Sequence, residues 1–278
     1  MFVFNDVLAV TNTTSLIDSL TNKIRTTIKK YPGLLCGIYI KSYGKTKNSL
    51  SQGIININGD NQFAAASLIK IPIAIALLKK IDNGEISWNE TLILKKHHYA
   101  QGAGFIRTRK AGTKIKLREV FKLMLTISDN TGTNMVIDRL GGINKTNSHI
   151  VNLGVKNTQL VNWLGDFKGT NKTSPHDLID ILDKALESNF LSNDSKQILR
   201  NTLLNVKNKS LINKGLGKYT KFPHKTGTIG ICIGDAGIVY LPWNKKFGIS
   251  IIVKRPFNSL QGQKVIREIS SLVYSSLK

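Results

Sequence analysis

The stretch Phe63-Ala64-Ala65-Ala66-Ser67-Leu68-Ile69-Lys70-Ile71-Pro72-Ile73-Ala74-Ile75-Ala76-Leu77-Leu78 is almost wholly apolar, with a serine and a lysine three residues apart. If this run is helical, Ser67 and Lys70 share a face, and the lysine amine lies beside the serine hydroxyl. Because burying an ammonium is costly, a buried lysine can lose its proton near neutral pH and act as a base beside a nucleophile. The alternative is a core helix whose lysine extends into solvent at one end.

The composition is that of a folded and strongly basic chain. Its 278 residues are enough for one large domain or two, and 41% of them are apolar, too many for a disordered chain. The 40 Lys and Arg against 17 Asp and Glu give a net charge of +23, which can indicate a nucleic-acid or membrane partner or attract anionic small molecules. The basic residues are spread along the chain without a zinc-finger, RNA-recognition or basic-zipper pattern, so we expect no nucleic-acid partner.

The N-terminal residues show no pattern of an export signal. Residues 1–10 lack a basic start and a cleavage site of small residues. No run reaches the roughly 18 apolar residues of a membrane span. We therefore expect neither a signal peptide nor a transmembrane helix in this sequence.

Two cysteines and an adjacent pair of histidines are the candidates for redox or metal chemistry. Cys36 and Cys232 lie in apolar runs typical of strands, which indicates two buried free thiols, although a disulfide stays open. Neither cysteine has a ligand-spaced Cys or His nearby. His97 and His98 lie in a polar stretch, where we expect them to be solvated. The sequence therefore predicts no metal and no cofactor.

Periodicity and chain breakers predict strands at both ends of the chain and helices in the middle. Helices are expected at residues 14–30, 67–81, 117–126, 131–140, 144–153, 175–187, 193–204 and 259–277. Strands are expected at residues 34–40, 49–55, 225–228, 236–241 and 247–253, with a turn at Gly44 between the first two. Residues 82–112, 155–174 and 206–221 are expected to be irregular.

This order of elements indicates an α/β (α+β) fold, in which an antiparallel sheet flanked by helices is built from both ends of the chain. Residues 1–58 and 206–278 are expected to form this discontinuous sheet domain, and residues 59–205 an inserted all-α domain. A cleft between two such domains is where a site is most often found.

Three short motifs carry the functional signal: Ser67-x-x-Lys70, Ser128-Asp129-Asn130 and Lys225-Thr226-Gly227. Taken alone, Ser128-Asp129-Asn130 would be read as an ordinary helix cap, and Lys225-Thr226-Gly227 would be read as a turn. Because the three motifs occur together in this order and at this spacing, the chain resembles the superfamily of serine β-lactamases and penicillin-binding proteins, and most closely class A β-lactamases. The resemblance covers residue 15 to the end and includes Met124-Leu125-Thr126, Thr131-x-x-Asn134, Gly141-Gly142 and Thr173-Ser174-Pro175.

The resemblance implies a hydrolase that opens β-lactams, or a peptidoglycan-like acyl substrate, through an acyl-Ser67 intermediate. Ser67 would attack the carbonyl carbon, and Lys70 would take the hydroxyl proton directly or through water. Ser128 would pass a proton to the leaving nitrogen. The backbone N–H groups of Ser67 and Thr228 would form the oxyanion hole.

The resemblance also implies the residues that bind the substrate. Asn130 would hold a side-chain carbonyl, and Lys225 and Thr226 would bind the substrate carboxylate. Gly227 would let the strand edge approach the substrate closely. An arginine that the family often has on the next strand is not evident, because Gly234-Asp235 occupy that area.

The sequence departs from the class A pattern in the loop that follows the Ser-Asp-Asn helix. Class A enzymes carry there a glutamate that activates water to hydrolyse the acyl-enzyme, whereas Leu164 follows Trp163 at this point. Asn162 replaces the arginine that braces the loop, and Asn171 or Lys172 replaces the aspartate partner of that arginine. The loop is also several residues shorter.

Asp166 is the only carboxylate in residues 155–174 and is the candidate for the deacylating base, two residues after the expected position. Without such a base, acylation proceeds and deacylation is slow or differently catalysed. The protein would then be a poor β-lactamase, a penicillin-binding D-alanyl-D-alanine peptidase-like enzyme or an esterase. The resemblance further implies a monomer that works outside the cytoplasm, in the periplasm or its equivalent.

Overall fold

The computed structural model describes residues 3–43 and 53–278, and its centre is a five-stranded antiparallel sheet in the order β2-β1-β9-β8-β7. Two strands come from the N-terminal part of the chain and three from the C-terminal part: β1 (Leu35–Ser42), β2 (Ile54–Ile57), β7 (His224–Ile229), β8 (Cys232–Tyr240) and β9 (Lys246–Lys254). The fold predicted from the order of elements, an antiparallel sheet built from both chain ends, is confirmed.

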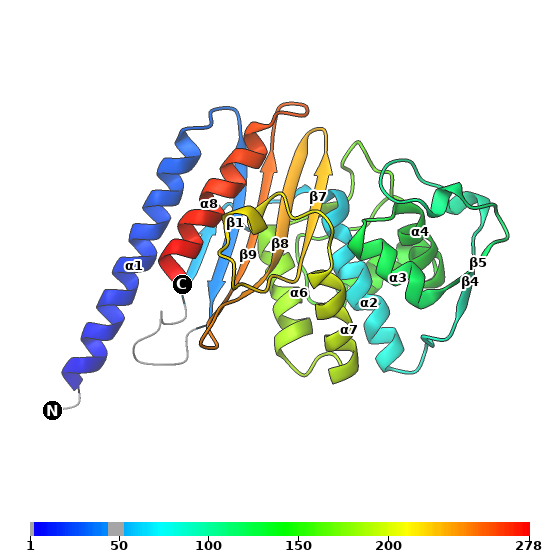
Figure 1. Ribbon diagram of the computed structural model, residues 1–278, viewed down its shortest axis with the longest axis horizontal. Coiled ribbons are helices and arrows are strands. Elements are labelled where there is room, and N and C mark those ends of the chain that lie inside the picture. Colours follow the sequence, from blue (N-terminus) through cyan, green and yellow to red (C-terminus); the bar gives the residue numbers. More distant parts are fainter. Residues whose placement is uncertain (1–2, 44–52) are drawn as a thin grey trace.

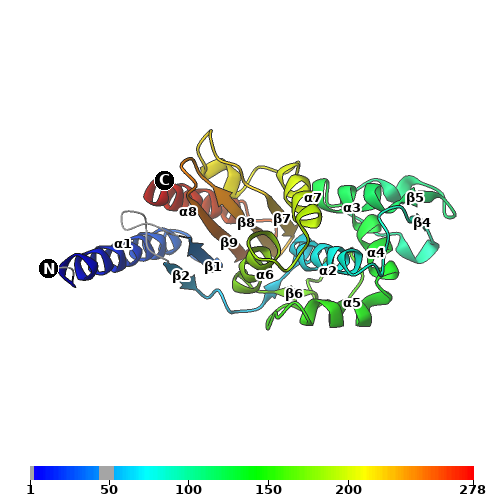
Figure 2. The same ribbon diagram turned by 90° about the horizontal axis from the view of Figure 1, so that it is seen from below.

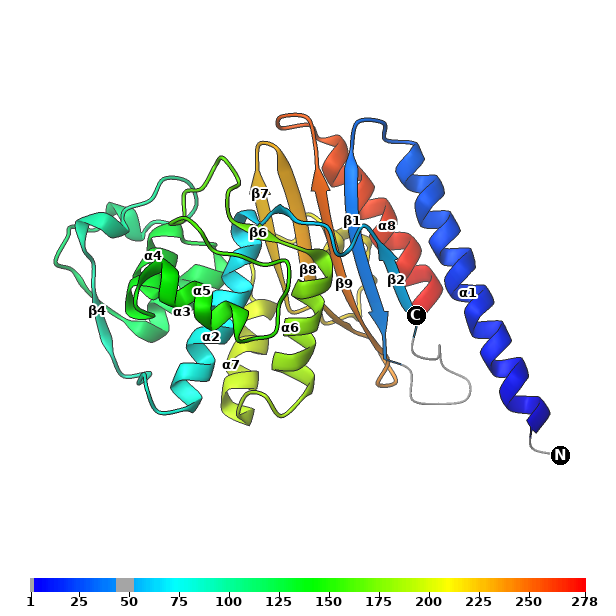
Figure 3. The ribbon, with the colours of Figure 1, turned by 180° about the vertical axis from the view of Figure 1, so that it is seen from behind.

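Helices cover both faces of this sheet (Figure 1). On one face lie α1 (Val3–Lys29) and α8 (Gln261–Leu277), and on the other α6 (Pro175–Glu187), so that Figures 2 and 3 show the sheet between them. The side chains of β9 alternate between the two faces of the sheet, and both faces are buried. Phe247, Ile249, Ile251 and Val253 pack in the core beneath α1 and α8, whereas Ile252 packs in the other core.

A helical region follows β2 and surrounds the apolar helix α2 (Lys70–Asp82). Its other helices are α3 (Leu117–Thr126), α4 (Asn130–Arg139), α5 (Gly142–Val151) and α7 (Asn193–Leu204). Two short ribbons complete it, formed by β3 (Phe63–Ala64) with β6 (Lys172–Thr173) and by β4 (Thr91–Ile93) with β5 (Lys114–Lys116). Single 3₁₀ turns lie at Ala66–Ile69, Lys96–His98, Ile106–Thr108 and Ile212–Gly215.

Several elements differ from the sequence prediction, and β8, for example, begins at Cys232 and not at residue 236. Helix α1 begins at Val3, earlier than predicted. Strand β2 covers residues 54–57, whereas the prediction was 49–55, of which 49–52 lie outside the described residues. Ile55 and Ile57 alternate into the core and so set the register. Strand β4 lies in a segment predicted to be irregular and has a single inward residue, Leu92, which gives too short a pattern to detect. The predicted turn at Gly44 lies outside the described residues.

The proposed division of the chain at residues 58 and 206 stays a prediction. Helix α6 belongs to the predicted all-α part of the sequence, yet it packs against β1, β8 and β9. The two parts therefore share a continuous apolar core around α2 and α6.

Both cysteines are buried free thiols and do not form the disulfide that the sequence left open. Cys36 lies on β1 and Cys232 on β8, with β9 between them. Burial raises the pKa of each thiol to about 12, so both are protonated at neutral pH. Among the described residues, no helix is long and apolar enough to cross a membrane.

Candidate active site

Ser67 and Lys70 meet where the 3₁₀ turn Ala66–Ile69 leads into α2. Ala66 has a left-handed φ of 45°, a conformation that costs energy for a residue with a side chain and is often found at functional sites. Lys70 is fully buried, and its Nζ lies 3.0 Å from Ser67 Oγ. The predicted juxtaposition of amine and hydroxyl is thus present, and Lys70 does not extend into solvent.

Ser128, just before α4, and Asn130, its first residue, supply three oxygens to the Lys70 amine. Lys70 Nζ lies 2.7 Å from the Ser128 carbonyl oxygen, 2.9 Å from Ser128 Oγ and 2.7 Å from Asn130 Oδ1. Ser128 also has a left-handed φ, of 63°, which directs both of its oxygens to the amine. Asp129 caps α4 by accepting from Gly132 N, so the motif is a helix cap as well as part of the site.

Strand β7 brings Lys225 to the same serine. Lys225 Nζ donates to Ser128 Oγ at 3.1 Å and to the Thr226 carbonyl at 2.7 Å. A Cβ at Gly227 would lie 2.9 Å from the Leu68 side chain and 3.1 Å from the Ala65 carbonyl oxygen. The close approach of this glycine to a substrate stays a prediction. The glycine lets β7 pack against the turn that carries Ser67.

These residues line one cleft of about 310 Å³. Its lining includes Ser67, Ser128, Lys225, Thr226 and Thr228 of the predicted set. Lys70, Asn130 and Gly227 lie outside this lining, and Lys70 reaches it through its contacts with Ser67 and Ser128. Lys207, which no sequence motif indicated, lines the same cleft from the segment after α7, and its backbone N donates to Thr126 O at 2.9 Å. In the described part of the chain no carboxylate pairs with Lys207, so it adds a free cation to the cleft.

The two buried lysines have different protonation properties. Burial, followed by the positive charge of Lys225, holds the pKa of Lys70 well below the ordinary lysine value. Burial also lowers the pKa of Lys225, but the carboxylate of Asp235 opposes this effect and leaves the pKa at about 8. Both amines are therefore easier to deprotonate than an exposed lysine, and each has one opposing carboxylate, Asp129 for Lys70 and Asp235 for Lys225.

Leu164, at the sequence position of the expected deacylating glutamate, is held by Asn134 of α4. Its N donates to Asn134 Oδ1 at 2.8 Å, and its carbonyl accepts from Asn134 Nδ2 at 3.2 Å. Asn134 lies one helical turn after Asn130 on α4, which places it on the face of Lys70. The Leu164 side chain is only 7% exposed and packs in the helical core, so it offers no group that could activate water.

Asn171 closes the neck of the loop that carries Leu164. Its Oδ1 accepts from the backbone N of Val161 and of Asn162, at 2.8 and 2.9 Å, and its Nδ2 donates to the Asn162 carbonyl at 3.1 Å. Of the two candidates for the bracing position, the structure thus places Asn171 opposite Asn162, with a neutral amide in place of an ion pair.

Asp166 is bonded to the backbone of the loop. Its Oδ2 accepts from Asn171 N at 2.7 Å. Over residues 3–43 and 53–278, no hydrogen bond joins this carboxylate to Ser67, Lys70 or Ser128. A deacylating role for Asp166 stays a prediction, and this geometry favours a role in holding the loop.

Replacing Asp166 by asparagine separates these roles, because the amide oxygen can still accept from Asn171 N but cannot take a proton. We expect the rates of acylation and of acyl release to stay within about threefold of the wild type, since a general base contributes far more. The test is the loss of a penicillin adduct over time by mass spectrometry. A selective slowing of release would instead make Asp166 the deacylating base.

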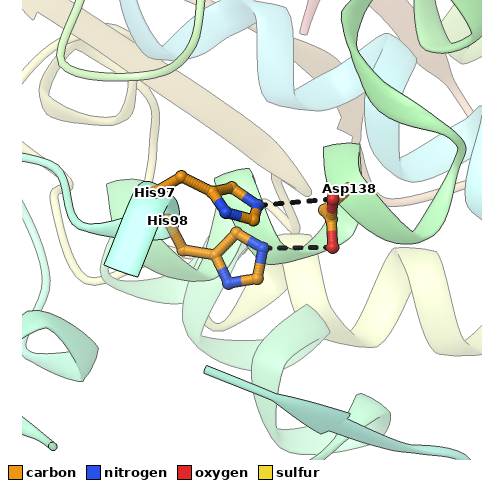
Figure 4. Close-up of side chains that lie close together, drawn as sticks. All are labelled: His97, His98 and Asp138. Atoms are coloured by element: carbon orange, nitrogen blue, oxygen red, sulfur yellow. Dashed lines mark hydrogen bonds and ion pairs between the residues drawn. The ribbon is translucent and has the colours of Figure 1, made fainter. Parts of the chain in front are cut away.

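His97, His98 and Asp138 form a second cluster of side chains that could in principle hold a metal ion. Their ligand atoms all lie within 4.8 Å of one another (Figure 4). The prediction that both histidines are solvated is wrong for His98, which is 2% exposed. The reason is packing against α4, the helix that carries Asp138.

The hydrogen bonds of this cluster do not suit a metal ion. His98 Nδ1 accepts from Lys95 N at 3.0 Å, so the ring proton is on Nε2, which faces Asp138 Oδ2 at 3.3 Å. A metal would need the lone pair of that nitrogen. The Lys95 ammonium also lies 2.8 Å from Asp138 Oδ2 and already neutralises the carboxylate.

Known proteins resemble this chain over most of its length. Residues 19–277 match the model of the beta-lactamase enzyme family. The β-lactamase VEB-1 of Pseudomonas aeruginosa is 26% identical over 93% of this chain and 90% of its own. A structure of PBP-A superposes with a TM-score of 0.88 and 38% identity, covering 93% of this chain and 95% of that one. A leucine-to-glutamate mutant of PBP-A, in an acyl-enzyme complex with penicillin G, has a TM-score of 0.89 and 37% identity, covering 93% and 96%.

Proposed function

Since this chain belongs to the beta-lactamase enzyme family, we propose that it opens β-lactam rings by acylating Ser67 and releases the acyl group slowly. The observation that supports this proposal is the contact of Ser67 Oγ with the Lys70 amine, in a site that lacks a deacylating carboxylate. As far as the chain is described, neither residue has a carboxylate within hydrogen-bonding distance.

The contacts of Lys70 favour its role as the base. The Ser128 carbonyl and Asn130 Oδ1 only accept hydrogen bonds, since Asn130 Nδ2 donates to the Gln101 carbonyl. The two N–H groups of a neutral amine therefore go to these oxygens. The lone pair of the nitrogen is then left for the two hydroxyls, those of Ser67 at 3.0 Å and Ser128 at 2.9 Å.

Acylation follows from this arrangement as a balanced transfer. The Ser67 proton passes to Lys70 Nζ while Oγ bonds to the lactam carbonyl carbon. The C–N bond of the ring then breaks, and its nitrogen takes the proton of Ser128 Oγ, which lies 2.9 Å from Lys70 Nζ. Lys70 returns its extra proton to Ser128, so both residues end as they began.

Substrate binding would place an anion in the cationic part of the cleft. We assign the substrate carboxylate to Lys225 and Thr226, with Lys207 as an additional cation at the rim. The oxyanion hole would be the N–H groups of Ser67 and Thr228. A small-molecule acyl substrate fits such a cleft, and we propose that a monomer acts on it outside the cytoplasm.

Slow release follows from Leu164, which provides no base for the attacking water. The relative PBP-A, in its leucine-to-glutamate mutant, forms an acyl-enzyme with penicillin G, which supports an acyl-enzyme at Ser67. The same absence of a base favours the alternative function, a penicillin-binding peptidase-like or esterase-like enzyme with little β-lactamase activity.

The fate of the adduct tests the proposal. We expect intact-protein mass spectrometry after exposure to penicillin G to show an adduct of one penicillin that persists after the free antibiotic is removed. Peptide mapping should place it on Ser67, and the Ser67→Ala variant should remain unlabelled. Rapid loss of the adduct, with fast turnover of a chromogenic cephalosporin, would show an efficient β-lactamase. Equal cephalosporin turnover by the wild type and Ser67→Ala would overturn the assignment of Ser67.

A further inference from the structure

Arg107 is a cation beside the cleft that takes no part in the steps above. Its Nη1 donates to Gln101 Oε1 at 2.8 Å, and its side chain is exposed. In the described part of the chain it forms no ion pair, whereas Arg109, two residues later, is paired with Glu119. Four of the five N–H donors of the Arg107 guanidinium are therefore left for a ligand.

Gln101 belongs to a wall of the cleft that the Ser-Asp-Asn motif holds in place. The Gln101 carbonyl accepts from Asn130 Nδ2 at 2.8 Å, and Asn130 N donates to the Ala103 carbonyl at 3.0 Å. Ala103 itself lines the cleft. One glutamine side chain thus separates the Arg107 guanidinium from the Asn130 amide, the group to which the family resemblance assigns the carbonyl of an acyl side chain.

The cleft is bordered by cations and has no carboxylate in its described lining. Lys207 and Lys225 both line it. The two stretches that supply Ala103 and these lysines, residues 91–118 and 195–234, hold 16 of the 40 Lys and Arg and none of the 17 Asp and Glu. A cleft with charges of one sign concentrates ligands of the opposite sign, and more strongly when the ligand carries two charges.

Asp129 is the carboxylate bonded to the wall that precedes Arg107. Its Oδ2 accepts from the N–H groups of Phe105 and Ile106, at 2.8 and 2.9 Å, and its Oδ1 from Gly132 N at 2.7 Å. The Asp129 side chain is 0% exposed, and over residues 3–43 and 53–278 it forms no ion pair. It therefore holds the wall and leaves the guanidinium of Arg107 unpaired.

We propose that Arg107 binds a carboxylate on the acyl side chain of the substrate, so that the site favours acyl compounds with two carboxylates. One carboxylate would lie against Lys225 and Thr226, and the second would lie past Asn130 against the guanidinium. A guanidinium can hold a carboxylate through two parallel hydrogen bonds, which suits this contact. This inference rests on the proposed function, since it names the substrate class of the same site.

Two penicillins that differ by one carboxylate test the assignment: benzylpenicillin and α-carboxybenzylpenicillin. The measurement is the second-order rate constant for acylation of Ser67 by each, and the quantity compared is the ratio of the α-carboxybenzyl to the benzyl value. We expect Arg107→Gln to lower this ratio by about three- to fivefold, the effect of an exposed ion pair. The difference between wild type and variant should shrink at high salt, because salt screens exposed charges.

Lys110→Gln is the matched control, because it removes an exposed cation from the same segment and does not touch Gln101. In the described part of the chain, the Lys110 side chain makes no hydrogen bond or ion pair; only its carbonyl accepts, from Thr113. We expect the wild-type ratio. An equal drop in Lys110→Gln would overturn the proposal, because the general charge of the segment would then be the cause. An unchanged ratio in Arg107→Gln would overturn it directly.

Binding to Ser67→Ala distinguishes failure of this inference from failure of the proposed function. This variant cannot be acylated, so an NMR titration gives a Kd for each penicillin. Adding Arg107→Gln to it should weaken binding of α-carboxybenzylpenicillin by about three- to fivefold more than that of benzylpenicillin. If neither penicillin labels the wild type, the proposed acylation fails, and these Kd values still decide the role of Arg107. Equal weakening of both penicillins, or binding of neither, would refute that role.

Discussion

Replacing Lys70 by methionine is expected to slow acylation of Ser67 by about 10²- to 10⁴-fold, the usual contribution of a positioned general base. Methionine matches the length of the lysine stem but cannot take the proton of the Ser67 hydroxyl, 3.0 Å away. The measurement is the second-order rate constant for labelling by a fluorescent penicillin. The adduct should still form on Ser67, only more slowly.

Lys79→Met is the matched control, because Lys79 lies on the same helix α2 and donates to the Phe190 carbonyl, not to a site residue. We expect this variant to label at the wild-type rate. If Lys70→Met also kept a rate within about threefold of the wild type, far less than a general base contributes, the base would be another group.

Replacing Leu164 by glutamate is expected to speed loss of the penicillin adduct by about 10²-fold or more. The substitution puts a carboxylate at residue 164, whose backbone N donates to Asn134. Asn134 lies one helical turn after Asn130, which contacts Lys70, so the carboxylate would lie near the site. The attacking water would then have a base. A polar group in place of a buried leucine should lower the free energy of unfolding by about 1–3 kcal/mol.

The Leu164→Gln variant separates chemistry from packing, because glutamine has the size of glutamate and cannot accept the proton of water. We expect its adduct to persist as in the wild type, with a similar loss of stability in thermal unfolding. Equally fast release by both variants would mean that a loosened loop, and not a base, limits the wild type. Unchanged release in both would show that Leu164 is not the position that decides deacylation.

The helices and the sheet were largely predictable because their signals are short-range. The apolar spacing of α3, α6 and α8 and the alternation of β9 each depend on neighbours within one element. Apart from the early starts of α1 and β8, the errors concern short elements: β2 is set by the burial of Ile55 and Ile57, and β4 gains its place by pairing with β5. Such pairing joins segments far apart in the chain, which local patterns do not report.

The sequence by itself determined the candidate nucleophile and base, the two motifs that meet them, and the loss of the loop glutamate at Leu164, because residue types at defined spacings specify this chemistry. Only the tertiary structure decided the environment of each lysine. Lys70 and Lys225 are both buried, and burial lowers the pKa of both. The burial of His98, the Asn171 bonds across the loop and the entry of Lys207 into the cleft were likewise decided by packing. Burial and proximity arise from contacts between distant segments, and they set the protonation of a group that the sequence merely names.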